Sequence, residues 1–266
     1  WNALMIEGMA HAGRIFGEPD WVASARRALD FVGNNLWQSG RLLVTHKDGV
    51  SHLNAYLDDY AFLLKASLEM AQADFRIGDL TFSLSLADAL LSQFEDCDNG
   101  GFFFTSHDHE PLIQRPKLGF DNATPSGNGV AAVALQRLAH LSGDLRYQQA
   151  AERTLAHFYP AIEEHPSGHG TLLVALEEYL APSRVLLLTG PAEETSDWQM
   201  RLARCYLPDL IALSPGPAAG LPPPLVRPAG KQVNAYLCQG VTCLPALSDW
   251  AQLQAALNPP IVRAAN

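Results

Sequence analysis

The chain has 266 residues, of which 48% are hydrophobic, so it has ample material for a core and is not a mainly disordered protein. Its formal net charge of −10, from 28 acidic and 18 basic residues without a basic stripe, argues against nucleic acid as a partner. No apolar run reaches the roughly 20 residues that span a bilayer, so we expect no membrane partner and a soluble, cytoplasmic protein.

The sequence begins in a helical pattern. Trp1 is followed by apolar residues at helical spacing, and no capping residue precedes them. This indicates a start inside or just before a helix, and we interpret the chain as part of a longer protein.

Three glycine–acid pairs mark a repeat of two helices. They begin at Gly17, Gly78 and Gly143, and in each an aromatic residue follows the glycine by four positions and a leucine by twelve. The runs before the glycines are apolar nearly all round, which predicts inner helices buried on most sides. Each glycine is expected to supply the left-handed residue that ends its inner helix. These inner helices are predicted at residues 4–16, 56–75 and 130–141.

The runs after the glycines are amphipathic and predict outer helices with one wet face. The pattern is clearest in the first of them. Its apolar side is formed by Trp21, Ala25, Ala28, Leu29 and Val32. Its polar side, which we expect to face solvent, is formed by Arg26, Arg27 and Asp30.

The connections between helices are unequal in length. Turns from inner to outer helices are short, whereas the returns to the next inner helix run over residues 38–54 and 95–126. Long loops gathered on one face of a rigid scaffold usually hold the function. Here they also meet the N-termini of the inner helices, where free N–H groups favour oxygen-rich ligands.

Each long connection is predicted to contain a β-hairpin. In the first, residues 41–44 form a strand that turns back at Asp48-Gly49. In the second, residues 102–104 are expected to pair with residues 112–113.

The pattern changes in the last third of the chain. The proline-rich segment 215–228 is predicted to hold no regular core element. We divide the chain into helix-pair repeats at residues 1–183 and a C-terminal part at residues 184–266, packed on the same domain. The elements predicted here are an inner helix at 170–180, a strand at 185–188, a helix at 192–206, a strand at 210–213 and a helix at 249–257.

The four cysteines are too few and too scattered for a disulfide framework, and they fit a reducing compartment. Cys238 and Cys243 have four residues between them, which matches neither a C-x-x-C redox motif nor common zinc spacing. We therefore expect two unpaired loop or strand thiols. No histidine or carboxylate spacing supports a metal, and we predict neither a metal nor a cofactor.

Several segments resemble the YyaL-like family, also called the spermatogenesis-associated protein 20 family. The resemblance spans nearly the whole chain, and it is most specific from Arg115-Pro116-Lys117 to Ser126-Gly127-Asn128. The matching segments are residues 1–6, 56–61, 100–103, 115–117, 121–128 and 236–238.

The resemblance implies a mainly α fold, an (α/α)6 toroid of the six-hairpin glycosidase-like kind, incomplete at the N-terminus. It also implies a thioredoxin-like domain that precedes the toroid in the full-length protein and would be its partner. The toroid is similar to those of sugar 2-epimerases and glycosidases, which is an analogy of fold.

Three carboxylates are the candidate catalytic residues: Asp58, Asp59 and Asp121. Asp58 and Asp59 begin the second inner helix and point about 100° apart, so at most one of them faces a central cavity squarely. An inward carboxylate would serve as acid or base in sugar chemistry, and the alternative is that it complements the helix dipole. Asp121, in the long loop, is the second carboxylate of a possible pair across a cleft.

Arg115 and Lys117 are candidates for binding an acidic sugar or phosphate, or for pairing with the acidic residues and fixing the loop. Ser126 is expected to cap the third inner helix. Asn128 would bind a ligand or form a buried hydrogen bond.

His52 and His169 precede inner helices, and His11 lies within one, so each is a possible base or a structural residue. Aromatic rings near the mouth, including Tyr56, Phe102 and Phe120, would stack on sugars or belong to the core. The complete set of candidate substrate-binding residues is Trp1, Asn2, Tyr60, Arg115, Lys117, Asn122, Asn128, His52 and His169.

The leading functional hypothesis is a carbohydrate-binding or carbohydrate-active toroid with a sugar ligand. An epimerase would have two cavity-facing histidines, and a hydrolase would have two opposed carboxylates. The alternative is a non-catalytic scaffold or interaction module that works with the thioredoxin-like domain.

Overall fold

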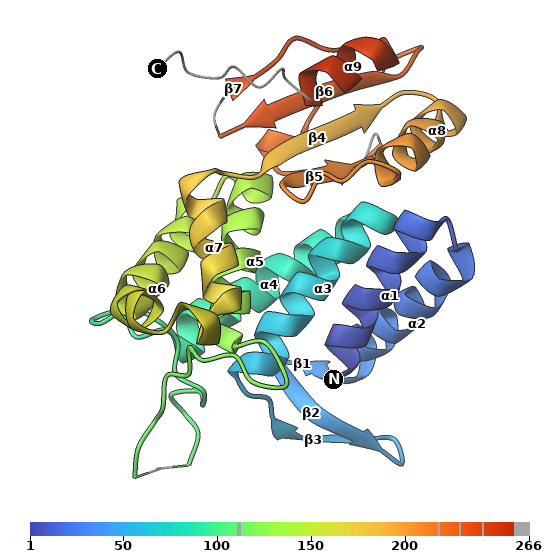
Figure 1. Cartoon of the computed structure of the whole chain (residues 1–266). Coiled ribbons are helices and arrows are strands. Elements are labelled where there is room, and N and C mark those ends of the chain that lie inside the picture. Colours follow the sequence, from blue (N-terminus) through green and yellow to red (C-terminus); the bar gives the residue numbers. More distant parts are fainter. Residues whose placement is uncertain (111–112, 217–218, 229, 241, 258–266) are drawn as a thin grey trace, which may run out of the picture.

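The computed structural model describes residues 1–110, 113–216, 219–228, 230–240 and 242–257. A helical body carries loops at one end and a small mixed sheet at the other (Figure 1). The predicted mainly α fold is confirmed, and its helix pairs are arranged as part of an α/α toroid. No helix in the described ranges is long and apolar enough to cross a membrane.

The inner helices α1 (Asn2–Phe16), α3 (Leu57–Ala73), α5 (Gly127–Ser142) and α7 (Gly170–Leu180) pack side by side in this order. The outer helices α2 (Pro19–Asn35), α4 (Ile77–Phe94) and α6 (Leu145–Glu164) each pack on the preceding inner helix. The predicted pairing of inner and outer helices is therefore confirmed.

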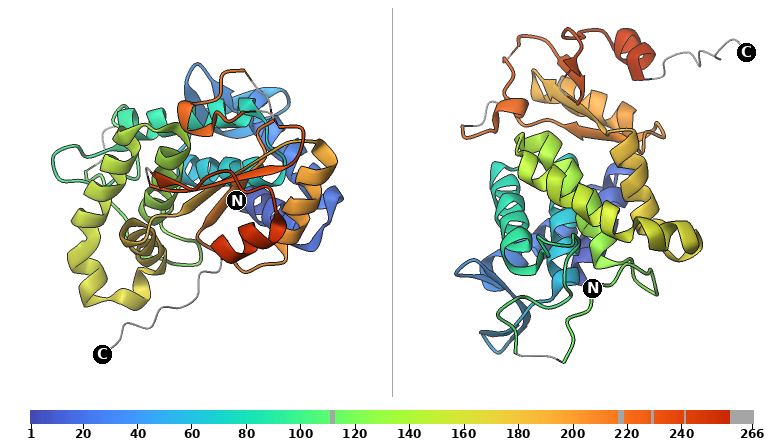
Figure 2. Two further views of the ribbon diagram at one scale, coloured as in Figure 1. Left: turned by 90° about the horizontal axis from the view of Figure 1, so that it is seen from above. Right: turned by 90° about the vertical axis from the view of Figure 1, so that its left-hand side faces the viewer.

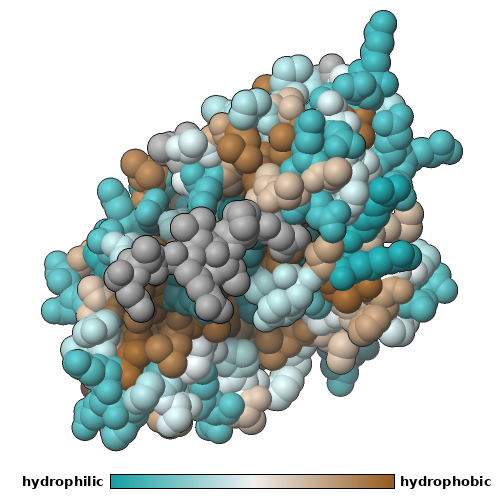
Figure 3. Space-filling view, turned by 45° about the horizontal axis from the view of Figure 1, so that its top comes forward, coloured by the Kyte–Doolittle hydropathy of each residue, from teal (hydrophilic) through white to brown (hydrophobic). Residues whose placement is uncertain are grey.

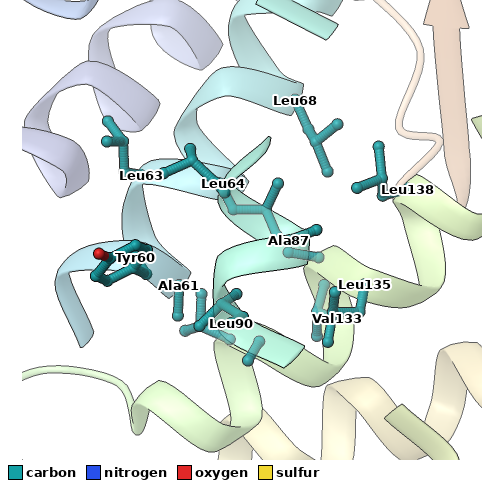
Figure 4. Close-up of a cluster of buried hydrophobic side chains, with 14 of the residues drawn as sticks. Tyr60, Ala61, Leu63, Leu64, Leu68, Ala87, Leu90, Val133, Leu135 and Leu138 are labelled. Carbon is teal, nitrogen blue, oxygen red and sulfur yellow. The ribbon is translucent and has the colours of Figure 1, made fainter. Parts of the chain in front are cut away.

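Buried side chains of α3, α4 and α5 meet in the core. Figure 4 shows side chains of α3 against those of the two neighbouring helices, with Leu64 of α3 close to Ala87 of α4 and Leu68 of α3 facing Leu138 of α5. Residues on every side of α3 and α5 are buried, as predicted. The prediction was wrong for α1, whose Met5 and Phe16 are exposed, because α1 lies at the end of the row and has a helix neighbour on fewer sides.

Glycine ends two of the three inner helices in the predicted way. Gly17 and Gly143 have φ of 72° and 77° and accept the left-handed conformation that a side chain would disfavour. Gly78 does not: it lies inside α4, and α3 ends at Ala73 with Asp74 as its C-cap.

The first long connection forms the predicted hairpin, from β2 (Arg41–Lys47) to β3 (Val50–Asn54), with β1 (Trp37–Gln38) beside β2. The second predicted hairpin was wrong for the described residues. Phe102 forms a single bridge with Glu95, and the Phe104 N–H donates to the carbonyl of Pro116. Residue 112, in the strand expected to pair with residues 102–104, lies outside the described residues.

The C-terminal part forms a sheet of strand order β5-β4-β6-β7. β4 (Arg184–Thr189), α8 (Ala192–Ala203) and β5 (Leu210–Leu213) are the predicted strand-helix-strand unit, and β4 and β5 are parallel. α9 (Trp250–Leu257) is the predicted closing helix. β6 (Asn234–Gln239) and β7 (Thr242–Cys243) add antiparallel strands that the sequence did not predict.

This sheet lies between two layers of helices (Figure 2). Val185 and Leu187 of β4 belong to the core of the helical body, whereas Leu186 and Leu188 pack in a second cluster with Trp198 of α8. The sheet end of the molecule has a mostly hydrophilic surface with hydrophobic patches between the polar side chains (Figure 3). The proline-rich segment also contributes to the core, contrary to prediction, through Leu225 in the short 3-10 helix η2 (Pro223–Leu225).

The expectation of unpaired thiols at residues 238 and 243 was wrong. Cys238 and Cys243 face each other across β6 and β7 and form a disulfide, whereas Cys97 and Cys205 are free. The antiparallel register brings the two residues opposite each other, which their spacing along the chain does not reveal.

Arg26 was wrongly assigned to the solvent face of α2, because it is only 5% exposed. Its Nε donates to the carboxylate of Asp74 at 3.1 Å, and its Nη2 donates to the Asp74 carbonyl at 2.6 Å. Its Nη1 donates to the carboxylate of Asp79 in α4. One buried guanidinium therefore joins the first helix pair to the turn of the second.

We expect Arg26→Ala to lower the free energy of unfolding by about 3–5 kcal/mol, because it leaves Asp79 buried without its cation. Urea unfolding followed by circular dichroism measures the change. Arg27→Ala is the matched control, since Arg27 is exposed and its removal should change stability by no more than about 0.5 kcal/mol. Equal effects of the two substitutions would contradict the role of the buried network.

Candidate functional site

The N-terminal ends of the four inner helices lie at the same end of the molecule. Figure 1 places them beside the β2–β3 hairpin and the long connection after α4, with the C-terminal sheet at the opposite end. Near the other end of α3, Gln72 accepts a hydrogen bond from the Ala212 N–H of β5. The long loops and the positive ends of four helix dipoles therefore share one face, as predicted.

Two cavities that meet each other open on this face. The larger has a volume of about 590 Å³ and lies between the loop at residues 117–126, α6 and the start of α7. The smaller, of about 230 Å³, lies between Trp1 and Tyr56. Asp58, Phe104 and Thr124 line both cavities, so these residues mark where the two meet.

Asp58 is the titratable group at this junction. Burial, and after it the negative charge of Asp59, raise the pKa of its carboxyl from an ordinary 3.8 to about 6. A hydrogen bond from the Gly127 N–H at the start of α5 opposes both effects. A carboxyl group with a pKa near 6 exchanges protons readily at neutral pH, which suits general acid–base chemistry.

Gly127 leaves the space that Asp58 occupies. A Cβ at residue 127 would lie 2.1 Å from the Asp58 Oδ1 and 3.1 Å from the Leu57 side chain. The absence of a side chain therefore lets the carboxylate reach the N-terminus of the neighbouring helix.

Asp59 has a different task from its neighbour. Its carboxylate accepts the Tyr56 N–H at 3.0 Å and completes a capping box at the start of α3. It also lines the smaller cavity. The helical spacing predicted such a division between the two aspartates, and the structure shows which of them is engaged in capping.

Asp121 joins two helix N-termini. Its Oδ1 accepts the Ser126 N–H at 2.8 Å, and its Oδ2 accepts the Thr171 N–H of α7 at 2.7 Å. Both carboxylate oxygens are thus committed to backbone groups of α5 and α7, which gives Asp121 a structural role.

The two loop cations contact the loop itself. The Arg115 Nη2 donates to the Thr105 carbonyl at 2.6 Å, and its guanidinium lies 4.2 Å from the centre of the Phe103 ring. The Lys117 Nζ donates to Asp96 at 2.8 Å and to the Gly100 carbonyl at 2.9 Å. Of the two roles predicted for Arg115 and Lys117, the contacts match fixing of the loop. Neither side chain pairs with Asp58, Asp59 or Asp121, and Lys117 pairs with Asp96 instead.

Gly100 shows why this loop needs glycine. Its φ is 75°, and a Cβ there would lie 2.3 Å from the Arg153 carbonyl oxygen. The chain therefore passes against the backbone of α6 at a point where only glycine fits.

Asn128 is fully buried and forms hydrogen bonds with the backbone of two loop segments, at Phe102 and at Leu118. Its Oδ1 accepts the Phe102 N–H at 2.7 Å, and its Nδ2 donates to the carbonyls of Phe102 and Leu118, each at 3.0 Å. The predicted buried hydrogen bond is present, and both N–H donors are used. Asn122 is exposed beside the larger cavity, and the Ser126 hydroxyl caps α5 by accepting the Gly129 N–H as predicted.

The three candidate histidines lie in different places. His169 lines the larger cavity and is 5% exposed, with its Nδ1 2.8 Å from the His165 carbonyl. His52 lies on exposed β3 beside Thr45. His11 contacts Glu69, and this hydrogen bond raises its pKa.

The remaining candidates divide between cavity and core. Trp1 and Asn2 line a third cavity of about 210 Å³ beside Asp59, and Trp1 also reaches the smaller cavity at Asp58. Tyr60 is 1% exposed, and its hydroxyl accepts the Leu42 N–H, which places it in the core. Phe102 is also a core residue.

Phe104 and Thr124, which line both cavities, were not singled out from the sequence. Phe104 stacks on Tyr56 with ring centres 4.9 Å apart, and Thr124 bridges the two cavities. The only signal for Phe104 was its place in an aromatic run that the sequence assigned to a hairpin. In the described part of the chain, no group of three His, Cys, Asp or Glu side chains is arranged to hold a metal.

No protein-family model matches the chain. Over 97% of its length, the chain is 26% identical to spermatogenesis-associated protein 20 from both Homo sapiens and Rattus norvegicus. It is 23% identical, over the same share, to uncharacterized protein B0495.5 of Caenorhabditis elegans. The resemblance to spermatogenesis-associated protein 20 is confirmed. The chain spans about a third of the length of these curated relatives: 36% of the human protein and 37% of the nematode protein.

Two solved structures share part of the helix arrangement. A cellobiose 2-epimerase from Spirochaeta thermophila is 21% identical with a TM-score of 0.48, and the match covers 59% of this chain and 41% of that one. The GH76 α-mannanase BT2949 of Bacteroides thetaiotaomicron is 14% identical with a TM-score of 0.43, covering 61% and 43%. At these TM-scores the likeness carries no argument about substrate or reaction.

Residues in the segments that resemble spermatogenesis-associated protein 20 form hydrogen bonds that hold the loops and helix ends in place. Lys117 fixes the loop at Gly100, Asp121 joins α5 to α7, and Asn128 holds Phe102. Asp58 is the exception, since its carboxyl group faces the cavities with a raised pKa. It is the strongest candidate for chemistry.

Asp58→Asn tests the environment of this group through stability. A folded-state pKa above the unfolded value means that the folded protein holds the proton more tightly. The stability that this proton contributes is present below about pH 4 and is lost as the pH rises to about 6. We expect the stability of the wild-type protein relative to Asp58→Asn to fall over that window, measured by urea unfolding at pH 4 to 7.5. Parallel pH profiles would show that the pKa is not raised.

Proposed function

We propose that the two cavities bind a carbohydrate and that Asp58 acts on it as a general acid or base. The observation that carries the proposal is the position of Asp58, a carboxyl group with a pKa of about 6 where the two cavities meet. A carboxyl group is tuned in this way where it transfers protons near neutral pH.

The lining supports a sugar as the ligand. Phe104, Tyr56 and Trp1 provide flat apolar surfaces on which a pyranose ring can stack. Asn122 and Thr124 provide polar groups suited to hydroxyls beside these rings. The helix N-termini around the cavities favour ligands rich in oxygen.

His169 is the proposed partner of Asp58 in the larger cavity. Its Nδ1 is 2.8 Å from the His165 carbonyl, so Nδ1 carries the proton and Nε2 is the basic nitrogen. A carboxyl group and an imidazole on one cavity suit proton transfer on a sugar, as in an isomerase or epimerase, with Asp58 in place of the second histidine expected from the sequence. A glycosidase is less well supported, because Asp59 and Asp121 accept backbone hydrogen bonds at helix N-termini.

A second candidate function is a non-catalytic interaction module that works with a thioredoxin-like domain of the full-length protein. The specific observation in its favour is that Arg115, Lys117, Asp121 and Asn128 are all engaged with the protein itself. In that case the polar groups at this face order the loops and bind no sugar.

Thermal unfolding with a panel of neutral, amino and acidic sugars separates the two functions. A sugar at about ten times its Kd adds about 1.4 kcal/mol and raises the Tm by about 3–5 °C. We expect one class of sugar to do so with the wild-type chain. Asp58→Asn and His169→Gln should lose the shift while remaining folded without sugar.

Asp20→Asn is the matched control, because it removes the same charge from an exposed position in the first turn of α2. It should keep the shift. If no sugar raises the Tm of the folded wild-type chain, the carbohydrate proposal fails and the interaction module is favoured. If a sugar raises the Tm of all three variants as much as that of the wild type, Asp58 and His169 do not form the sugar site.

A further inference from the structure

The disulfide at the sheet end lies beside an arginine. The Arg227 Nη2 is 3.4 Å from the Cys238 Sγ and 3.5 Å from the Cys243 Sγ, so one guanidinium contacts both sulfur atoms. Arg227 follows η2, in the proline-rich segment, and reaches β6 and β7 from outside the hairpin.

The guanidinium is held in place without being neutralised. Its Nη1 donates to the Val226 carbonyl at 2.8 Å, and its centre lies 5.5 Å from that of the Tyr236 ring. Within the described ranges, Arg227 has no carboxylate within ion-pair distance. Its positive charge is therefore available to the sulfur atoms.

The two sulfur atoms differ in access. Cys243 is exposed on β7, the last strand of the sheet, whereas Cys238 is only 9% exposed on β6. A thiolate from solution can approach the Cys243 sulfur, and the sulfur that departs is then that of Cys238 beside Arg227. A cation next to a cysteine lowers its thiol pKa, and a thiol of lower pKa leaves faster.

We propose that Cys238 and Cys243 form a reversible thiol–disulfide exchange site for a dithiol reductant, with Arg227 stabilising the thiolate that leaves. The first thiolate of the dithiol attacks the Cys243 Sγ, a mixed disulfide forms, and Cys238 departs as a thiolate. The second thiol of the dithiol, as its thiolate, attacks the mixed disulfide and releases Cys243 as a thiolate, which takes up a proton. Two electrons pass to the protein, and the reductant becomes a cyclic disulfide.

The experiment uses the whole chain with Cys97→Ser and Cys205→Ser, so that the two remaining thiols are those of the exchange site. Dithiothreitol is the probe, and the reduced fraction is followed by alkylation and mass spectrometry under native conditions. We expect reduction within the folded protein, with Arg227→Gln about three- to tenfold slower and Arg227→Lys closer to the wild type. In a glutathione buffer, Arg227→Gln should shift the equilibrium toward the disulfide by up to about tenfold.

A second readout separates electrostatics from structure. The alkylation rate of the reduced protein, measured against pH, should reach half its maximum at a higher pH in Arg227→Gln, by about one unit. Arg201→Gln is the matched control, because the Arg201 side chain contacts Asp197 and Trp250 in the same part of the fold and, in the described residues, does not contact the sulfur atoms of Cys238 and Cys243. It should leave the rates and the pH profile unchanged.

Either of two results would overturn the proposal. In the first, the disulfide resists excess dithiothreitol until the protein unfolds, which makes it a structural crosslink. In the second, Arg227→Gln matches Arg201→Gln in rate, equilibrium and pH profile, which leaves the guanidinium without a role in exchange.

Discussion

The loop face depends on one constraint: backbone N–H groups at helix N-termini have no partner within the helix and need an acceptor when they are buried. Four inner helices bring such ends to one face. Asp59 accepts the Tyr56 N–H, the Ser126 hydroxyl accepts the Gly129 N–H, and Asp121 accepts from the starts of α5 and α7. Several of the acidic and hydroxyl groups that suggest a sugar site therefore accept the free N–H groups of the helices, which allows these helix ends to lie close together.

The same constraint limits which of these groups are free to act. Both carboxylate oxygens of Asp121 accept backbone hydrogen bonds, so this side chain is engaged in joining the helices. Asp58 accepts one such bond from Gly127, and burial together with the charge of Asp59 raises its pKa despite that bond. The competition between desolvation and capping thus decides which aspartate is suited to acid–base chemistry.

The sequence predicted the helix pairs, the first hairpin and the strand-helix-strand unit, because these follow from hydrophobic period and turn residues within one segment. It could not predict features that depend on which segments meet. Arg26 lies on the polar side of its own helix yet is buried by α3 and α4. Cys238 and Cys243 pair through a strand register, and Phe104 reaches the site because its loop folds back on Pro116. Each is a contact between segments that leaves little trace in local periodicity.

The repeat itself helps to locate the site. Ala3, Asp58, Asn128 and Thr171 occupy the second position of α1, α3, α5 and α7, and so lie at equivalent places in the four inner helices. Asn128 uses its neutral amide to tie two loops, and Thr171 donates its backbone N–H to Asp121. Asp58 is the ionisable residue among the four. Because an amide at that position can satisfy backbone groups without the desolvation cost of a charge, the carboxyl group of Asp58 exceeds what capping requires, and proton transfer where the two cavities meet is the use that we propose for it.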